Sequence, residues 1–419
     1  MGIFGEVADN GVSGCSPVVG AHRRKSGIWG PEKERCRLLP AGPSFARSSR
    51  LCGRIHEKPA CDAWVECVIM PRMKPFITTI IAMIWFWGAL LVGASCHSMA
   101  TPAQPEMLEL AGDLRVHDPA MIRHGDTFYI FSTGGRSGRG VIHVRCSRDL
   151  YNWTRCGSVF EKLPEWSSRE MPEARSAWAP DISFFNGKYH LYYSVSAFGT
   201  NNSAIGLATN LTLDPNSPDY EWEDQGMVIR SVAGRDDYNA IDGNLVLEDS
   251  DKAWLCWGSF WGGIKMSRID KTTGKLSSTD TTVYSLASRP SAASRQRAAA
   301  GAIEAPFIVK HEGFWYLFVS FDLCCRGADS TYKIMVGRSQ NVTGPYRDRE
   351  NKLMTEGGGS LVLQATTPNW RGPGHCAIIQ DVSGDYMVFH AYHGGTGRSE
   401  LKISTIVWEH GWPQVAELP

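Results

Sequence analysis

The chain lacks an excess of charge of either sign and has no cysteine pair with zinc-site spacing. Its 43 basic residues balance its 43 acidic residues, so no net field attracts nucleic acid or an anionic membrane. None of the cysteines shows the CxxC spacing typical of a structural zinc site. These absences favour a neutral polymer or a small molecule as the partner, and no nucleic acid.

Long apolar runs are also scarce, and the only one covers residues 76–94. It follows a short basic start at Met73 and precedes small residues that end at Ala100, a pattern typical of a secretory signal. Residues 73–100 are therefore predicted to be a signal peptide, and the mature protein is expected to be extracellular and free of the membrane. Because 19 apolar residues can also span a bilayer, an uncleaved anchor through residues 76–94 is the alternative.

Residues 1–72 do not fit a secreted chain, because a signal peptide begins at the chain start. They show no sustained period of 2 or 3.6. We expect a non-native leader with the true start at Met73; a disordered tail is the alternative. Downstream, N-glycosylation sequons at Asn152, Asn201, Asn210 and Asn341 agree with a secretory route.

Five internal segments share one plan: an acid or its substitute, an apolar strand, a short turn, and an aromatic strand that ends in small polar residues. The segments begin "HDPAMI", "WAPDIS", "IDGNLV", "IEAPFI" and "GHCAII". The equivalent first positions are Asp118, Trp178, Asp242, Glu304 and His375, which lie 60, 64, 62 and 71 residues apart. This period, with no long helical pattern between the repeats, predicts an all-β, five-bladed β-propeller over residues 101–419.

In a propeller the innermost strands line the central channel, so Asp118, Asp242 and Glu304 are expected to converge. Clustered carboxylates suit either a calcium site or glycoside hydrolysis, which needs one protonated and one ionised carboxyl group. A third acid nearby raises the pKa of the proton donor. Asp181 lies three residues past the equivalent position and is interpreted as a cleft-edge or strand-start residue.

The stretches "VHDPAMI", "NAIDGNLVL", "AIEAPFIV", "DLCCRG" and "GPGHCAII" resemble the endo-1,5-α-L-arabinanases of glycoside hydrolase family 43, in order over residues 114–414. The resemblance implies a five-bladed propeller that hydrolyses internal linkages of arabinan and arabino-oligosaccharides with inversion. It implies that Asp118 is the general base, that Glu304 is the general acid, and that Asp242 tunes and orients the acid. We expect a monomer.

The same resemblance implies further site residues. Those at the sugar subsites would be Trp178, Phe198, Gly199, Asn239, Ser259, Phe260 and Trp261. His375 would lie beside a structural calcium or similar ion, and no organic cofactor is implied. Three features differ from the family pattern or extend it: Gly243 follows the third acid, Cys376 follows His375, and a low-complexity loop, predicted to protrude, covers residues 287–301.

Two cysteine pairs invite a disulfide interpretation. Cys146 and Cys156 could close a short hairpin, whereas the adjacent Cys324 and Cys325 could be a disulfide or two thiols. Two other functions stay open beside the endo-arabinanase: an exo-acting arabinofuranosidase or β-xylosidase of the same fold, and a non-catalytic carbohydrate-binding propeller. The last has no reason to keep all three acids.

Overall fold

The computed structural model describes residues 104–134, 140–289 and 301–419. The predictions for residues 1–72 and 73–100, and for most of the loop at 287–301, lie outside these ranges. Within the described ranges, no helix is both long and apolar enough to cross a membrane.

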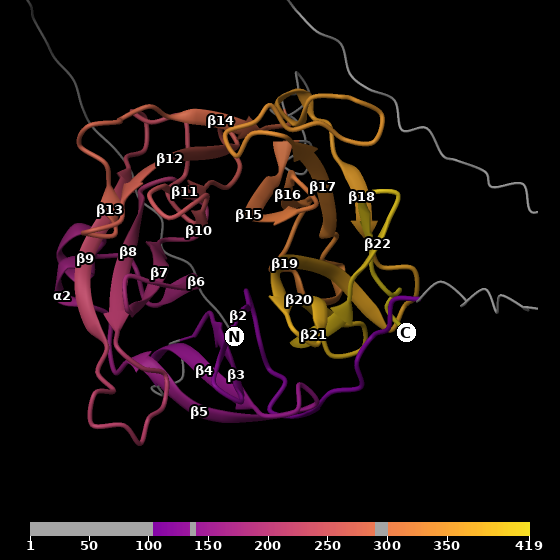
Figure 1. Cartoon of the computed structure of the whole chain (residues 1–419), viewed down its shortest axis with the longest axis horizontal. Helices are drawn as coiled ribbons and strands as arrows, with labels where there is room; N and C mark the ends of the chain where they lie inside the picture. Colours follow the sequence, from indigo (N-terminus) through magenta and orange to yellow (C-terminus); the bar gives the residue numbers. More distant parts are fainter. Residues whose placement is uncertain (1–103, 135–139, 290–300) are drawn as a thin grey trace, which may run out of the picture. The chain divides into compact units, whose positions relative to one another are not determined.

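Five antiparallel sheets surround a central axis, each with its first strand innermost (Figure 1). Blade 1 comprises β2 (Ala120–His124), β3 (Thr127–Ser132), β4 (Val141–Ser147) and β5 (Asn152–Phe160), with β1 (Ala111–Gly112) parallel to β5. Blade 2 comprises β6 (Ala177–Phe185), β7 (Lys188–Ser196), β8 (Ser203–Asn210) and β9 (Glu223–Ser231). Blade 3 comprises β10 (Asn244–Leu247), β11 (Ala253–Trp257) and β12 (Ile264–Asp270), with β13 (Lys275–Leu276) and β14 (Tyr284–Ala287) both on β12.

Blade 4 comprises β15 (Ile303–His311), β16 (Phe314–Phe321), β17 (Lys333–Ser339) and β18 (Ser360–Leu363). Blade 5 comprises β19 (Trp370–Asp381), β20 (Gly384–His393) and β21 (Ser399–Thr405), and a hairpin of β22 (Val407–Glu409) and β23 (Trp412–Gln414) follows. The described helices are short: α2 (Glu165–Glu170), η2 (Gly327–Asp329) and η3 (Met354–Glu356). The predicted all-β, five-bladed propeller is confirmed.

Five hydrophobic clusters fill the spaces between neighbouring blades. The second strand of a blade sends successive side chains into different clusters: Tyr193 packs toward blade 1, whereas Tyr192 packs toward blade 3. Likewise, Leu317 and Phe318 belong to the clusters on the two sides of blade 4. Because both faces are buried, these strands read as nearly continuous apolar runs.

The ring closes through the segment before β2. The Leu108 amide donates to the Ile403 carbonyl (2.9 Å) and the Thr405 amide donates to the Glu106 carbonyl (2.9 Å), which adds this segment to β21 of the last blade. A few residues later, β1 pairs with β5 of the first blade. The two ends of the propeller are thereby joined by main-chain hydrogen bonds.

Two disulfides are present among the described residues. One joins Cys146 and Cys156 across β4 and β5, a pairing that the sequence allowed but did not settle. The other joins the adjacent Cys324 and Cys325, which resolves the alternative that the sequence left open.

Every inner strand has a left-handed residue at or next to its equivalent position. The φ angles are 54° at Asp118, 43° at Ala179, 58° at Asp242, 55° at Ala305 and 50° at His375. In β6, β15 and β19 the strand pairing shifts register at this point, as expected of a β-bulge. Such bulges redirect side chains, and here they lie where the five blades meet.

A side chain of the preceding blade accepts a hydrogen bond from each of these five amides. The pairs are Ala179 N with Thr133 Oγ1 (2.8 Å), Asp242 N with Ser194 Oγ (2.9 Å), Ala305 N with Asp242 Oδ2 (3.1 Å), His375 N with Ser320 Oγ (2.8 Å) and Asp118 N with His390 Nδ1 (3.1 Å). We call this set the amide ring. It ties each inner strand to its neighbour.

Replacing Ser194 with Ala should destabilise the protein by about 1–3 kcal/mol, because the Asp242 amide would be buried without an acceptor. Chemical denaturation measures the effect. Ser250→Ala in an exposed turn is the matched control and should leave stability nearly unchanged. Equal stabilities for the two variants would contradict a structural role for the amide ring.

Candidate active site

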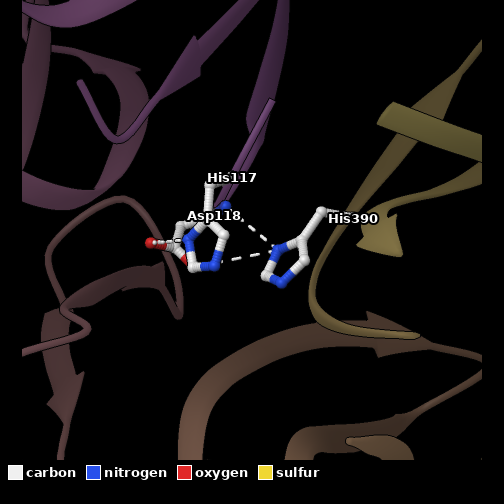
Figure 2. Close-up of side chains that lie close together, drawn as sticks. All are labelled: His117, Asp118 and His390. Atoms are coloured by element: carbon white, nitrogen blue, oxygen red, sulfur yellow. Dashed lines mark hydrogen bonds and ion pairs between the residues drawn. The ribbon is translucent and has the colours of Figure 1, made fainter. Parts of the chain in front are cut away.

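The Asp118 carboxylate lies at the axis and is surrounded by donors. Its Oδ2 receives the Thr133 hydroxyl (2.6 Å) and lies 2.8 Å from His117 Nδ1, while its Oδ1 lies 3.1 Å from His375 Nδ1. Figure 2 shows this carboxylate beside the rings of His117 and His390. Burial alone would raise the pKa of Asp118, but His117 and His375 hold it well below its usual value. Asp118 is therefore ionised.

Glu304, the second residue of β15, is buried between two hydroxyl groups. Ser259 donates to Oε2 (2.6 Å), and Tyr332 donates to Oε1. Burial raises the pKa of Glu304, and although these hydrogen bonds and His375 oppose the rise, the net shift is upward.

Asp242 lies against the residue that follows Glu304, because its Oδ2 accepts the Ala305 amide. Burial raises the pKa of Asp242 to about 8; His375 opposes this rise, whereas Glu304 and Asp118 add to it. Two carboxyl groups that raise one another's pKa hold a proton near neutral pH. The site thus combines one ionised carboxylate with a pair that keeps a proton.

His375 in β19 links these acids. Burial alone would lower its pKa, but Asp118, Asp242 and Glu304 raise it to about 9. Its ring is therefore an imidazolium that donates to Asp118. Four of the five equivalent positions, those of Asp118, Asp242, Glu304 and His375, thus interact electrostatically. The fifth, Trp178, lies half-buried in β6.

The other predicted site residues differ in exposure. Phe198 is 80% exposed and Trp261 is 50% exposed, and Gly199 is exposed beside Phe198, so all three are available to a ligand. Three more are covered to different degrees: Asn239 and Ser259 are buried, and Phe260 is partly buried. The Ser259 hydroxyl is directed at Glu304, and Asn239 Oδ1 has no hydrogen-bond partner among the described residues.

Four residues that contact the acids were not predicted from the sequence: His117, Thr133, Tyr332 and His390. Tyr392, which contacts His117 and His390, was not predicted either. Thr133 directly follows β3, where the repeat showed small polar residues, whereas His390 lies within β20 and stands at the same position in its blade. Tyr332 carried no comparable signal, since it belongs to a loop before β17.

Asp181 has a structural environment. Its carboxylate accepts the Leu245 amide (2.8 Å) and the Asn244 side-chain amide (3.1 Å), so it joins β6 to β10 of the next blade. It is buried in the interior of β6 and does not begin the strand. The sequence did not reveal the register shift between Trp178 and Asp181, and therefore did not show that Asp181 lies in the interior of β6.

Comparison with known proteins identifies the family. The model for glycosyl hydrolases family 43 matches residues 112–413. The chain belongs to this family.

The relatives include both exo- and endo-acting enzymes. The chain is 43% identical over 311 residues to the extracellular exo-alpha-(1->5)-L-arabinofuranosidase ArbA of Cellvibrio japonicus, which covers 73% of this chain and 88% of the relative. It is 42% identical over 330 residues to the extracellular endo-alpha-(1->5)-L-arabinanase 1 of Bacillus subtilis, covering 78% and 96%. A solved structure of Cellvibrio cellulosa alpha-L-arabinanase complexed with arabinohexaose superposes with a TM-score of 0.68 at 42% identity, covering 72% of this chain and 96% of that chain.

Replacing Asp242 with Asn should lower the pKa of Glu304, because one of the charges that opposes its ionisation is removed. Carbon-13 NMR titration of carboxyl-labelled glutamate measures this, with the signal assigned by its loss in Glu304→Gln. Asp251→Asn, in an exposed turn, is the control and should leave the Glu304 titration unchanged. An unchanged titration in Asp242→Asn would show that the two groups are not coupled.

Proposed function

We propose that the protein is an extracellular arabinan hydrolase that cleaves internal α-1,5-L-arabinofuranosyl linkages with inversion of configuration. One observation carries the proposal: an ionised carboxylate and a proton-retaining carboxyl pair share one buried site. Glycoside hydrolysis requires this combination. The names of the relatives supply the substrate class and the extracellular location.

In the proposed reaction Glu304 donates its proton to the oxygen of the leaving sugar while the glycosidic bond breaks. Asp118 accepts a proton from the water whose oxygen attacks the anomeric carbon from the opposite face. The product acquires the inverted configuration because the water attacks directly. Asp242 keeps the proton available to Glu304 and, through the Ala305 amide, fixes the backbone beside it.

Sugar binding is assigned to the exposed side chains near these acids. The faces of Phe198 and Trp261 are open to solvent and suit stacking on a sugar ring. Trp178, Gly199 and Phe260 would border the same subsites. Asn239 is buried, so it would border these subsites from beneath the surface.

A cation beside His375 is part of this proposal. The residues fit such an ion. His375 Nδ1 interacts with Asp118, and the other ring nitrogen can offer a lone pair once it is deprotonated. The neighbouring carboxyl groups supply negative charge. When bound, a calcium or similar ion would supply positive charge to the site. The nucleophilic water would still depend on Asp118.

The first test separates the two roles. Glu304→Gln should lose about 10²–10⁴-fold in activity on arabinan, yet keep most activity on substrates whose leaving group departs without a proton. Asp118→Asn should lose activity on both, because the water has no base. Initial-rate measurements on both substrate types decide this.

The matched control is Glu312→Gln, an exposed acid in the turn between β15 and β16, which should behave as wild type. Equal loss on both substrates in Glu304→Gln would contradict its role as the proton donor. Retention of configuration, seen by NMR at early times, would mean that Asp118 attacks carbon itself.

An exo-acting enzyme is the second candidate, because the exo-acting relative is as similar as the endo-acting one. Incubation with debranched arabinan and separation of early products by size distinguish them. We expect a broad range of oligosaccharides and a rapid fall in viscosity. A single short product from the first minutes would instead establish exo action.

A further inference from the structure

We infer that Tyr392 and the Cys325 amide set the tautomer of His117, so that His117 donates its Nδ1–H to Asp118. His117 and Tyr392 are then positioning residues for the base. The catalytic consequence rests on the proposed role of Asp118, but the assignment of hydrogens rests on hydrogen-bond geometry alone. Such assignments follow from the directions available to each donor and acceptor.

The first step concerns His390. The Asp118 amide donates to His390 Nδ1 (3.1 Å), so this nitrogen presents a lone pair. A ring with a lone pair at Nδ1 is neutral, in agreement with the burial that lowers the pKa of His390 well below its usual value. Its single hydrogen is therefore on Nε2, which lies 3.3 Å from the Tyr392 hydroxyl and donates to it.

The second step concerns the Tyr392 oxygen, which is surrounded by donors. Besides His390, the Cys325 amide donates to it (2.9 Å). These two donors occupy both lone pairs of the phenolic oxygen, so the Tyr392 hydrogen is directed at a separate acceptor. The acceptor that lies at hydrogen-bond distance from this hydroxyl is His117 Nε2, at 2.8 Å.

The third step follows for His117. With a lone pair at Nε2, the ring hydrogen is on Nδ1, which lies 2.8 Å from Asp118 Oδ2. The His117 and His390 rings stack at 4.0 Å between centroids, which prevents a ring flip without repacking (Figure 2). The hydrogen-bond chain thus runs from Cys325 and His390 through Tyr392 and His117 to Asp118.

The arrangement distinguishes the two oxygens of Asp118. The Thr133 hydroxyl accepts the Ala179 amide, so its hydrogen is also directed at Oδ2. Oδ2 therefore receives two strong hydrogen bonds, whereas Oδ1 receives only that of His375. Oδ1 is thus the oxygen that takes the proton from water.

The adjacent disulfide explains why the Cys325 amide is available. Cys325 has φ 64°, in the left-handed region, and its bond to Cys324 ties two neighbouring residues into one small ring. Cys325 Sγ lies 3.8 Å from His117 Nε2, so the disulfide also packs against the His117 imidazole. This places a fixed backbone donor at the Tyr392 oxygen.

Nitrogen-15 NMR of histidine-labelled protein reads the tautomer directly. In the wild type, the ring signals that disappear in His117→Asn should show a protonated Nδ1 and an unprotonated Nε2. A protonated Nε2 in the wild type would overturn the inference, whatever the variants do. This readout needs no activity, so it is independent of the proposed function.

Tyr392→Phe tests the consequence. We expect loss of the fixed Nδ1–H tautomer and a fall in kcat of about tenfold, typical of one disturbed hydrogen bond to a charged group, with KM little changed. Tyr386→Phe removes a hydroxyl from the same strand that bonds only near Ser383, and should match the wild type. Unchanged kcat in Tyr392→Phe would overturn the positioning role. Activity in Asp118→Asn would instead contradict the proposed base while leaving the tautomer result intact.

Discussion

The amide ring is the constraint on which the rest of the structure depends. A left-handed residue in a buried inner strand leaves its amide without the usual ladder partner, and an unpaired buried amide costs about 1–3 kcal/mol. A side chain from the preceding blade removes this cost at all five positions. The same hydrogen bonds hold the left-handed residues, among them Asp118, Asp242 and His375. Stability and site geometry therefore share one set of contacts.

Burial acts on every acid of the site, so the differences between them come from their partners. Asp118 faces His117 and His375 and stays ionised. Burial raises the pKa of both Asp242 and Glu304; the charge of Asp118 adds to the rise in both, and that of Glu304 adds to the rise in Asp242. The difference in pKa between Asp118 and the other two acids therefore arises because His117 and His375 lie beside Asp118.

The repeat in the sequence located the fold and the four interacting axial residues, because residues at one phase of a propeller must meet. It could not locate Tyr392, which lies 275 residues from His117, because that contact depends on packing between the last blade and the first. Nor could it show that the Ser259 hydroxyl is directed at Glu304, since the resemblance pointed only to a subsite. The polar residues that end the second strands were visible, but their role as acceptors required the bulges.

In blade 3, Asp242 both holds the backbone of the next blade and interacts with Glu304. At the point where the other blades place Thr133, Ser194, Ser320 or His390, blade 3 has Gly258, with φ 138°. A side chain there would collide with the Gly263 carbonyl, so this blade has no room for an acceptor at that position. Asp242 takes its place and accepts the Ala305 amide with its own carboxylate. The acid that interacts with Glu304 therefore also holds the backbone beside Glu304.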